Sequence, residues 1–530
     1  MQRYLDGLPV RAQKDSFTYR AGKFVRRNKA AVVAAALVVG FAVALWQAGV
    51  ARQERDRAER RFNDVRQLSN ALLTDIAPKI ERLQGATEAR QALLAQSLKY
   101  LDSLASESGD DPALQSELAA AYEKVGDLQG NPTNPNLMAL SDALASYEKA
   151  HAMRRALLER NPADAGQRRL LAHNYRALGD LRWQTNEQAE SLKNSEAALG
   201  LYTELLAAEP GSAELRLGLG RAHHDIGVTL SSNEKFAESI AHLQKAIDAA
   251  EEVRRQSPGS VAALRLLADS HKRMGNSLSW EGRQKEGEAE AEKAVALFES
   301  LVAAHPDDSS LRIGLYQTYM ITSGVYEEAD DPVSNEYAFK ALAIIETAVE
   351  RDPANRRARQ QLSKTYSRLG VTLQNVGRTA ESVGYLEKAV RILQELARGE
   401  TKNRRFQHDP ATALIRLGDT MRQRRDFPGA IRNLEEAAAI LSGMVETDAG
   451  DNASLRNLAN ACDSLAGVHE DLAAQAAGAK KQSRRRLAQQ NYQRALDILR
   501  RLEARNALSK YDRKSVETIR SAVEKYEREK

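Results

Sequence analysis

The sequence predicts an all-α protein in which a single transmembrane helix precedes an α-solenoid of about seven or eight long helix-turn-helix repeats. Two observations predict the repeats: prolines and glycines each recur at near-constant spacing through the middle of the 530-residue chain. A third predicts the membrane helix, since residues 30–50 form an uncharged, apolar stretch. Regular self-similarity of this kind is typical of stacked supersecondary units, so we expect helix pairs packed neighbour on neighbour.

The repeat has a period of about 48 residues. Five prolines are spaced 48, 48, 48 and 47 residues apart: Pro162, Pro210, Pro258, Pro306 and Pro353. Five glycines share this register, and an alanine follows each of them 19 residues later: Gly179 and Ala198, Gly227 and Ala246, Gly275 and Ala294, Gly370 and Ala389, Gly418 and Ala437. Small residues at fixed places predict close contact between paired helices, so these are the predicted repeat-packing residues.

The composition excludes several classes of protein. Aromatic residues make up only 5% of the chain and charged residues 28%, which disfavours one large globular core. The only cysteine, Cys462, excludes an intrachain disulfide, and we expect it to be a small buried thiol. Residues 1–29 hold eight Lys or Arg against two Asp, and the rest of the chain sums to about −1. The basicity is therefore a local arm, and we expect no nucleic-acid partner.

The apolar stretch over residues 30–50 is long enough to cross the ~30 Å hydrocarbon layer as a helix. A cleaved signal peptide is the alternative, although its apolar part is usually shorter. Residues 14–29 and 51–66 each carry six Lys or Arg, so the number of cations on the two sides of the helix does not decide its orientation. Four acidic residues are interleaved with the downstream cations, which favours an N-terminus inside the cell and repeats outside it.

Five segments follow from this organisation. They are a basic cytoplasmic juxtamembrane arm over 1–29, a transmembrane helix over 30–50, a helical stalk over 51–108, the solenoid over 109–500 and a C-terminal capping helix over 501–530. Apolar residues at spacings of three and four over 51–83 predict a helix through which the chain could self-associate. The basic run over 480–486 lies in an insertion that lengthens one repeat, and we expect it to be a solvated loop.

The repeat unit resembles the tetratricopeptide repeat over about residues 110–500. Each first helix holds an aliphatic residue followed by glycine, as at Ile226 and Gly227. Hydrophobic residues follow three and sixteen positions after the glycine, as at Leu230 and Leu243. The usual tetratricopeptide unit has about 34 residues, so we expect about four additional helical turns per unit here.

A second resemblance spans the whole chain. The opening RYLDGLPVRAQKDSFTYRAGKFVRRNKA, the apolar stretch and the later RFNDVRQLSNALLTDI, QALLAQSLKYLDSLA and GDLQGNP are similar to bacterial transmembrane Ser/Thr protein kinases, in the part after the kinase domain. The resemblance implies one span in the inner, cytoplasmic membrane, a cytoplasmic N-terminus and extracytoplasmic repeats. No Gly-rich loop, His-Arg-Asp or Asp-Phe-Gly motif is present, so we expect no catalysis by this chain.

These features predict a membrane-anchored interaction or sensor module, the kinase-less half of a Ser/Thr-kinase-type signalling receptor. The alternative is a stand-alone scaffold or assembly factor of the cell envelope. We expect a protein or peptide ligand in the concave groove, and we expect no cofactor and no metal.

Candidate ligand contacts are four arginines that each follow a leucine early in a first helix: Arg216, Arg265, Arg312 and Arg456. First helices line the concave groove of tetratricopeptide arrays, so these cations could hold an acidic peptide or a terminal carboxylate. A solvated helix face with local ion pairs is the alternative. His223 and His271 stand where other units have tyrosine, and we expect them and His224 to pack rather than to bind metal.

Overall fold

The computed structural model describes residues 17–34, 37–50, 52, 87–107, 111–130, 137–327, 332–398 and 404–528. Contacts divide the chain into two units, Met1–Ala71 and Leu72–Lys530, and each is described by itself. The stalk helix predicted over 51–83 lies outside the described residues, apart from position 52, and stays a prediction.

The described residues of the first unit form two successive helices. The short helix α2 (Phe17–Arg27) precedes the apolar helix Lys29–Val50, and the chain bends at Asn28 between them. The apolar helix is 22 residues long with a mean hydropathy of 2.2. This length and composition qualify it to cross a membrane. Its described side chains are almost all exposed.

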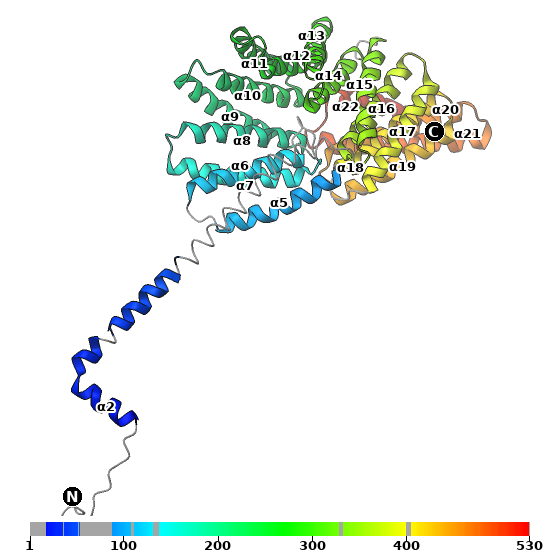
Figure 1. Ribbon diagram of the computed structural model, residues 1–530. Coiled ribbons are helices and arrows are strands. Elements are labelled where there is room, and N and C mark those ends of the chain that lie inside the picture. Colours follow the sequence, from blue (N-terminus) through cyan, green and yellow to red (C-terminus); the bar gives the residue numbers. More distant parts are fainter. Residues whose placement is uncertain are drawn as a thin grey trace, which may run out of the picture. The chain divides into compact units, whose positions relative to one another are not determined.

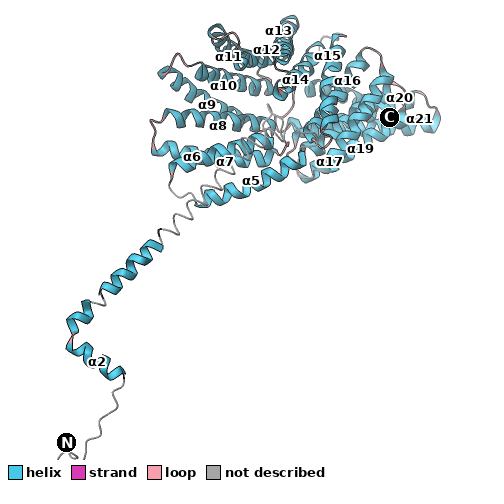
Figure 2. Ribbon diagram, in the orientation of Figure 1, coloured by secondary structure: helices cyan, strands magenta, loops and turns pink. Residues whose placement is uncertain are grey.

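The second unit is helical, and no strand occurs among its described residues (Figures 1 and 2). Helix pairs stack in sequence order between α5 (Thr87–Glu107) and α22 (Lys510–Arg528). The first helices of the pairs are α6 (Pro112–Gly130), α8 (Ala165–Gln184), α10 (Ala213–Ser232), α12 (Val261–Glu281), α14 (Ser309–Glu327), α16 (Arg356–Asn375), α18 (Arg404–Gln423) and α20 (Asn452–Ala474). The second helices are α7 (Leu140–Arg160), α9 (Gln188–Ala208), α11 (Phe236–Gln256), α13 (Gln284–Ala304), α15 (Val333–Arg351), α17 (Thr379–Arg398), α19 (Phe427–Thr447) and α21 (Gly478–Glu503). The predicted all-α solenoid of long repeats is confirmed.

The recurring prolines lie in the turns that join one pair to the next. In the turn before α12, the Ser260 backbone N–H donates to the Ser257 carbonyl at 3.0 Å, with Pro258 at the second position of this β-turn. The Ser260 hydroxyl then accepts a hydrogen bond from the Ala263 N–H at 3.3 Å and so caps α12. The same capping position, two residues after the proline, is filled in the other turns by Asp164, Ser212, Asp308 and Asn355.

The recurring glycines lie where the two helices of a pair cross. A Cβ atom on Gly275 would stand 2.7 Å from the carbonyl oxygen of Gly287 and 3.0 Å from the nitrogen of Ala291, both in the backbone of α13. A side chain there would therefore push the paired helices apart. The alanines of the same register are completely buried: Ala198, Ala246, Ala294, Ala389 and Ala437.

Helix α5 packs against α6 in the way that the second helices of later units pack. The Tyr122 hydroxyl of α6 donates to Asp102 of α5 at 2.6 Å. The same spacing of 20 residues recurs where Tyr366 donates to Glu346 at 3.0 Å. Helix α5 therefore packs as part of the solenoid, and it lies N-terminal to residue 109, where the solenoid is predicted to begin.

The basic run over 480–486 is predicted to be a solvated loop, and this prediction is wrong. The run lies in α21, and only Gln475–Ala477 separates α20 from α21. The inserted residues lengthen both helices of this pair, because a longer helix satisfies its own backbone N–H and C=O groups where a long loop would not. Beyond this pair, α22 is held by an ion pair between Arg456 Nε and Asp512 Oδ2 at 2.8 Å.

Candidate functional site: a basic groove on the first helices

A cavity of about 680 Å³ runs along the inner face of the solenoid. Most of its lining comes from the first helices of six successive pairs, α6, α8, α10, α12, α14 and α16. Eight lysine and arginine side chains line it, against four aspartates: Lys124, Arg176, Arg221, Arg265, Lys272, Arg273, Arg357 and Lys364, with Asp127, Asp180, Asp225 and Asp269. The groove is thus strongly polar with an excess of positive charge, although the chain beyond its N-terminal arm is close to neutral.

Helix register explains why these residues share one face. The residue nine positions after the capping residue lines the groove in five consecutive units: His173, Arg221, Asp269, Gln317 and Lys364. Residues three positions further on, such as Arg176 and Lys272, line it as well. Spacings of three and four keep side chains on the same side of a helix, so each first helix presents a short polar stripe to the groove.

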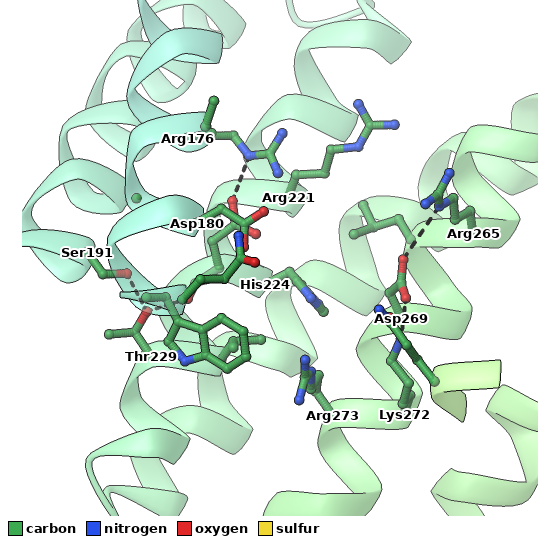
Figure 3. A pocket seen from close by; sticks show the side chains of 18 of the residues that line it. Arg176, Asp180, Ser191, Arg221, His224, Thr229, Arg265, Asp269, Lys272 and Arg273 are labelled. Carbon is green, nitrogen blue, oxygen red and sulfur yellow. Dashed lines mark hydrogen bonds and ion pairs between the residues drawn. The ribbon is translucent and has the colours of Figure 1, made fainter. Parts of the chain in front are cut away.

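Some of these charges are paired across neighbouring helices (Figure 3). Arg176 Nε of α8 lies 2.8 Å from Asp225 Oδ2 of α10, and Lys272 Nζ lies 2.6 Å from Asp269 Oδ1 within α12. Arg265 approaches the same Asp269 at 3.8 Å. Lys124 Nζ also lies 3.8 Å from Asp127 Oδ2, so ion pairs occupy three of the four aspartates and the groove is not a uniform cationic surface.

Asp180 of α8 has an unusual electrostatic environment. Burial, followed by repulsion from Asp225, raises the pKa of Asp180 to about 7, although Arg176, Arg273 and Arg357 oppose that rise. Arg273 belongs to α12 and Arg357 to α16, so cations from three different units act on one carboxyl group. The inner face of the solenoid therefore concentrates charges that are far apart in sequence.

The groove also makes it costly to keep arginine charged. Burial lowers the pKa of Arg221 and Arg273, and it lowers that of Arg357 to about 10. The Arg273 guanidinium lies over the Trp183 ring at 5.5 Å from its centroid. Among the residues that the structure describes, Arg273 Nε has no hydrogen-bond partner. An anion bound beside these arginines would stabilise their charged forms.

The four arginines predicted from sequence do not form one ladder. Arg265 lines the groove, where it also donates to Ser310 at 2.8 Å. Arg216 donates to the Pro210 carbonyl at 2.7 Å, and Arg312 makes the same contact with Pro306. Both side chains thus tie a first helix to the turn that precedes it.

The difference between Arg216 and Arg265 follows from their distance to the helix cap. Arg216 is four residues after its capping residue, whereas Arg265 is five after its own, which turns the side chain by about 100° around the helix. Arg456 is also five residues after its cap, Asp451, and it pairs with Asp512 of α22. None of Arg216, Arg312 and Arg456 lines the cavity.

Sequence reasoning missed most of the groove cations. Arg176, Arg221, Arg273 and Arg357 were not singled out, because charged residues on a first helix look alike until the inward face is known. The capping residue would have supplied that signal. Counting nine, twelve and thirteen positions from it selects Arg221, Arg176 and Arg273.

The histidines highlighted by the sequence have neighbours that differ from one unit to the next. His223 Nδ1 lies 3.2 Å from His242 Nδ1, His224 Nδ1 lies 3.3 Å from Ser270 Oγ, and the His271 imidazole contacts Glu290 at 2.5 Å. No group of three or more potential metal ligands occurs in the described parts of the chain. Cys462 is completely buried, as predicted, and burial raises the pKa of its thiol to about 11.

Comparison with known families supports the repeat assignment. Family models described as tetratricopeptide repeat match residues 220–253 and 362–397. The first match begins inside α10 and ends inside α11, so Ala213–Leu219 of α10 lies outside it. The longer repeat here therefore includes about two additional turns at the start of the first helix. No curated protein sequence matches the chain significantly.

The chain is also similar to several solved structures. Aspartyl phosphate phosphatase F from Bacillus subtilis is 13% identical, with a TM-score of 0.40, over 72% of this chain and 93% of that one. BtubC from P. vanneervenii is 16% identical, with a TM-score of 0.38, over 48% and 92%. The human IFIT1 dimer with PPP-AAAA is 15% identical, with a TM-score of 0.36, over 84% and 86%.

Proposed function

We propose that this chain is a membrane-anchored, non-catalytic interaction module whose groove binds an extended acidic segment of a partner protein. The observation that carries the proposal is the excess of cations over aspartates in one groove that spans six repeats. Repeat solenoids commonly use such extended concave surfaces for binding. A groove lined by six successive first helices suits an extended peptide, whose side chains can contact several units in turn.

The chemistry of the groove favours carboxylates as the recognised groups. Arginine presents a planar set of donors that matches a carboxylate in two parallel hydrogen bonds. Arg221, Arg273 and Arg357 come from three different first helices, α10, α12 and α16, so a bound chain could place acidic side chains opposite several units. Burial lowers the pKa of these arginines because it removes water from around their charged groups. An anion that binds these arginines therefore competes with little water.

We further propose that this module is the sensor half of a Ser/Thr-kinase-type receptor, with the N-terminus cytoplasmic and the repeats extracytoplasmic. The support is the resemblance of the segments on both sides of the apolar helix Lys29–Val50 to transmembrane kinases, together with the length of that helix. Purification of the full chain from its native membrane tests this link. Recovery of a Ser/Thr kinase supports it, whereas recovery of envelope complexes without a kinase would favour the scaffold alternative.

The groove is tested by binding of defined peptides to the full chain in detergent. The probes are fluorescent octaglutamate and octalysine, measured by anisotropy at low and moderate salt. We expect octaglutamate to bind and octalysine not to bind, with weaker binding at higher salt. Replacement of Arg273 or Arg221 by alanine should weaken octaglutamate binding by roughly tenfold or more, the usual effect of losing a charged hydrogen bond.

Arg216→Ala is the matched control, because it removes the same charge from a first helix but acts on the Pro210 turn. Its affinity for octaglutamate should stay within about twofold of the unmodified chain. If Arg216→Ala weakened binding as much as Arg273→Ala, or if octalysine bound equally well, the groove would not be the binding site.

A further inference from the structure

Helix α2 presents an apolar face that none of the described residues of the first unit buries. Phe17, Ala21, Phe24 and Val25 fall at positions i, i+4, i+7 and i+8, so they share an arc of roughly 100° on the helix. Phe17 is 88% exposed, Phe24 is 61% exposed and Val25 is 45% exposed. Large apolar side chains gathered on one exposed face of a helix mark an interaction site.

The same helix is strongly basic. Its eleven residues, FTYRAGKFVRR, contain four lysine and arginine residues and no aspartate or glutamate. Arg26 and Arg27 occupy its last turn, and both are exposed. A partner for this helix must therefore combine an apolar layer with negative charge.

The position of α2 in the chain selects one such partner. Asn28 alone separates α2 from the helix Lys29–Val50, and backbone hydrogen bonds of 2.9 Å run from Asn28 N–H to the Phe24 carbonyl and from Val32 N–H to the Asn28 carbonyl. If Lys29–Val50 spans a membrane, α2 emerges directly at the headgroup layer. An anionic leaflet offers acyl chains to Phe17 and Phe24 and phosphates to the cations.

We propose that α2 is an interfacial helix that lies in the headgroup layer of an anionic leaflet, with Phe17, Ala21, Phe24 and Val25 turned toward the acyl chains. The proposal rests on the membrane anchoring proposed above. A basic surface helix next to a membrane span would fix the angle at which the N-terminal arm leaves the bilayer. An isolated helix of this length is marginal in water, so lipid binding would also stabilise its helical form.

The test uses the full chain in vesicles and a fluorophore whose emission shifts to the blue when water is excluded. The label is attached to cysteine in a Cys462→Ser background, at Ala21→Cys on the apolar face or at Gly22→Cys about 100° away. Both positions are exposed, and a side chain at Gly22 would meet no atom within 4 Å, so the pair is matched. Vesicles contain phosphatidylcholine alone or with phosphatidylglycerol, and flotation reports whether the chain is anchored.

We expect the Ala21→Cys label to shift to the blue in vesicles with phosphatidylglycerol, and the Gly22→Cys label to stay close to its emission in water. Replacing Arg26 and Arg27 by glutamate should remove most of this shift, because each basic residue near an anionic surface strengthens binding roughly fivefold. The anchored chain should still float in every case.

Two outcomes would overturn the proposal and remain distinguishable. If the chain floats but both labels report water in both lipids, α2 does not bind the surface, while the membrane anchor stands. If the chain does not float with either vesicle, the proposed anchor itself fails and the lipid-binding role fails with it. A blue shift for Ala21→Cys that is equal in both lipids and survives the double glutamate variant would contradict recognition of anionic lipid.

Discussion

At the scale of single residues, identical side chains have different roles because their distance from the helix cap differs by one position. Arg216 and Arg312 tie their helices to the preceding proline turns, whereas Arg265 faces the groove. A step of one residue turns a side chain by about 100° around the helix. The residue type alone therefore does not identify a ligand contact in a repeat of this kind.

Asp180 gives the groove a predicted pH dependence. Its pKa is raised to about 7, so the carboxyl group is largely charged at pH 8 and largely neutral at pH 6. Protonation removes a negative charge that faces Arg273 and Arg357 and would repel an acidic ligand. Affinity for octaglutamate should therefore rise as the pH falls from 8 to 6, by roughly three- to tenfold, the effect of one nearby charge at partly screened distance.

The control for this titration is Asp180→Asn, which should bind octaglutamate about equally at pH 6 and pH 8. His224 does not confuse the measurement, because burial lowers its pKa to about 4. Burial also lowers the pKa of His173, the other imidazole in the groove. A pH response that Asp180→Asn leaves intact would show that another group controls binding.

At the scale of helices, the pairs depend on close approach at the recurring glycine. In α12, a Cβ on Gly275 would collide with the Gly287 carbonyl oxygen of α13, which belongs to the backbone and cannot rotate away. We expect Gly275→Ala to lower the free energy of unfolding by about 1–3 kcal/mol, the usual cost of overpacking, as measured by urea denaturation.

Gly384→Ala in α17 is the matched comparison. Gly384 also lies inside a helix, but a Cβ there would meet no atom within 4 Å. Alanine should therefore stabilise the protein by about 0.5–1 kcal/mol, because glycine is the poorer helix former. Destabilisation by both substitutions would mean that the close crossing is not what Gly275 provides.

At the scale of the whole second unit, the solenoid brings its beginning into contact with its fifth helix pair. The Thr87 hydroxyl at the start of α5 donates to Asp352 Oδ2 at 2.7 Å, across 265 residues of sequence. Asp352 is the last residue before the proline of the turn between α15 and α16. Both side chains are buried, so this contact is shielded from water.

Asp352→Ala should therefore loosen α5. Loss of a buried hydrogen bond costs about 1–2 kcal/mol, so amide hydrogen exchange in α5 should accelerate by roughly five- to thirtyfold. Asp448→Ala, at the corresponding position of the turn before α20, should leave exchange in α5 unchanged. Equal acceleration by both variants would indicate general destabilisation instead of a specific contact.

The sequence predicted the repeating parts of the fold because they depend on local rules. Proline in a turn, a capping residue two positions later and a small residue at each helix crossing act within one unit, and each recurs in the same register. The prediction of a loop over 480–486 is wrong because charge indicates only that a segment is exposed. Whether an exposed segment is a helix or a loop depends on how its backbone N–H and C=O groups form hydrogen bonds.

The sequence by itself determined the helix pairs, their length and order, the apolar helix Lys29–Val50 and the buried places of Ala246 and Cys462. Only the tertiary structure decided which face of each first helix lines the groove, and that Arg273, Arg357 and Asp180 meet there. The physical reason is that a helix pair follows from contacts within one unit. The inner surface depends instead on small rotations between successive units, and these accumulate along the solenoid.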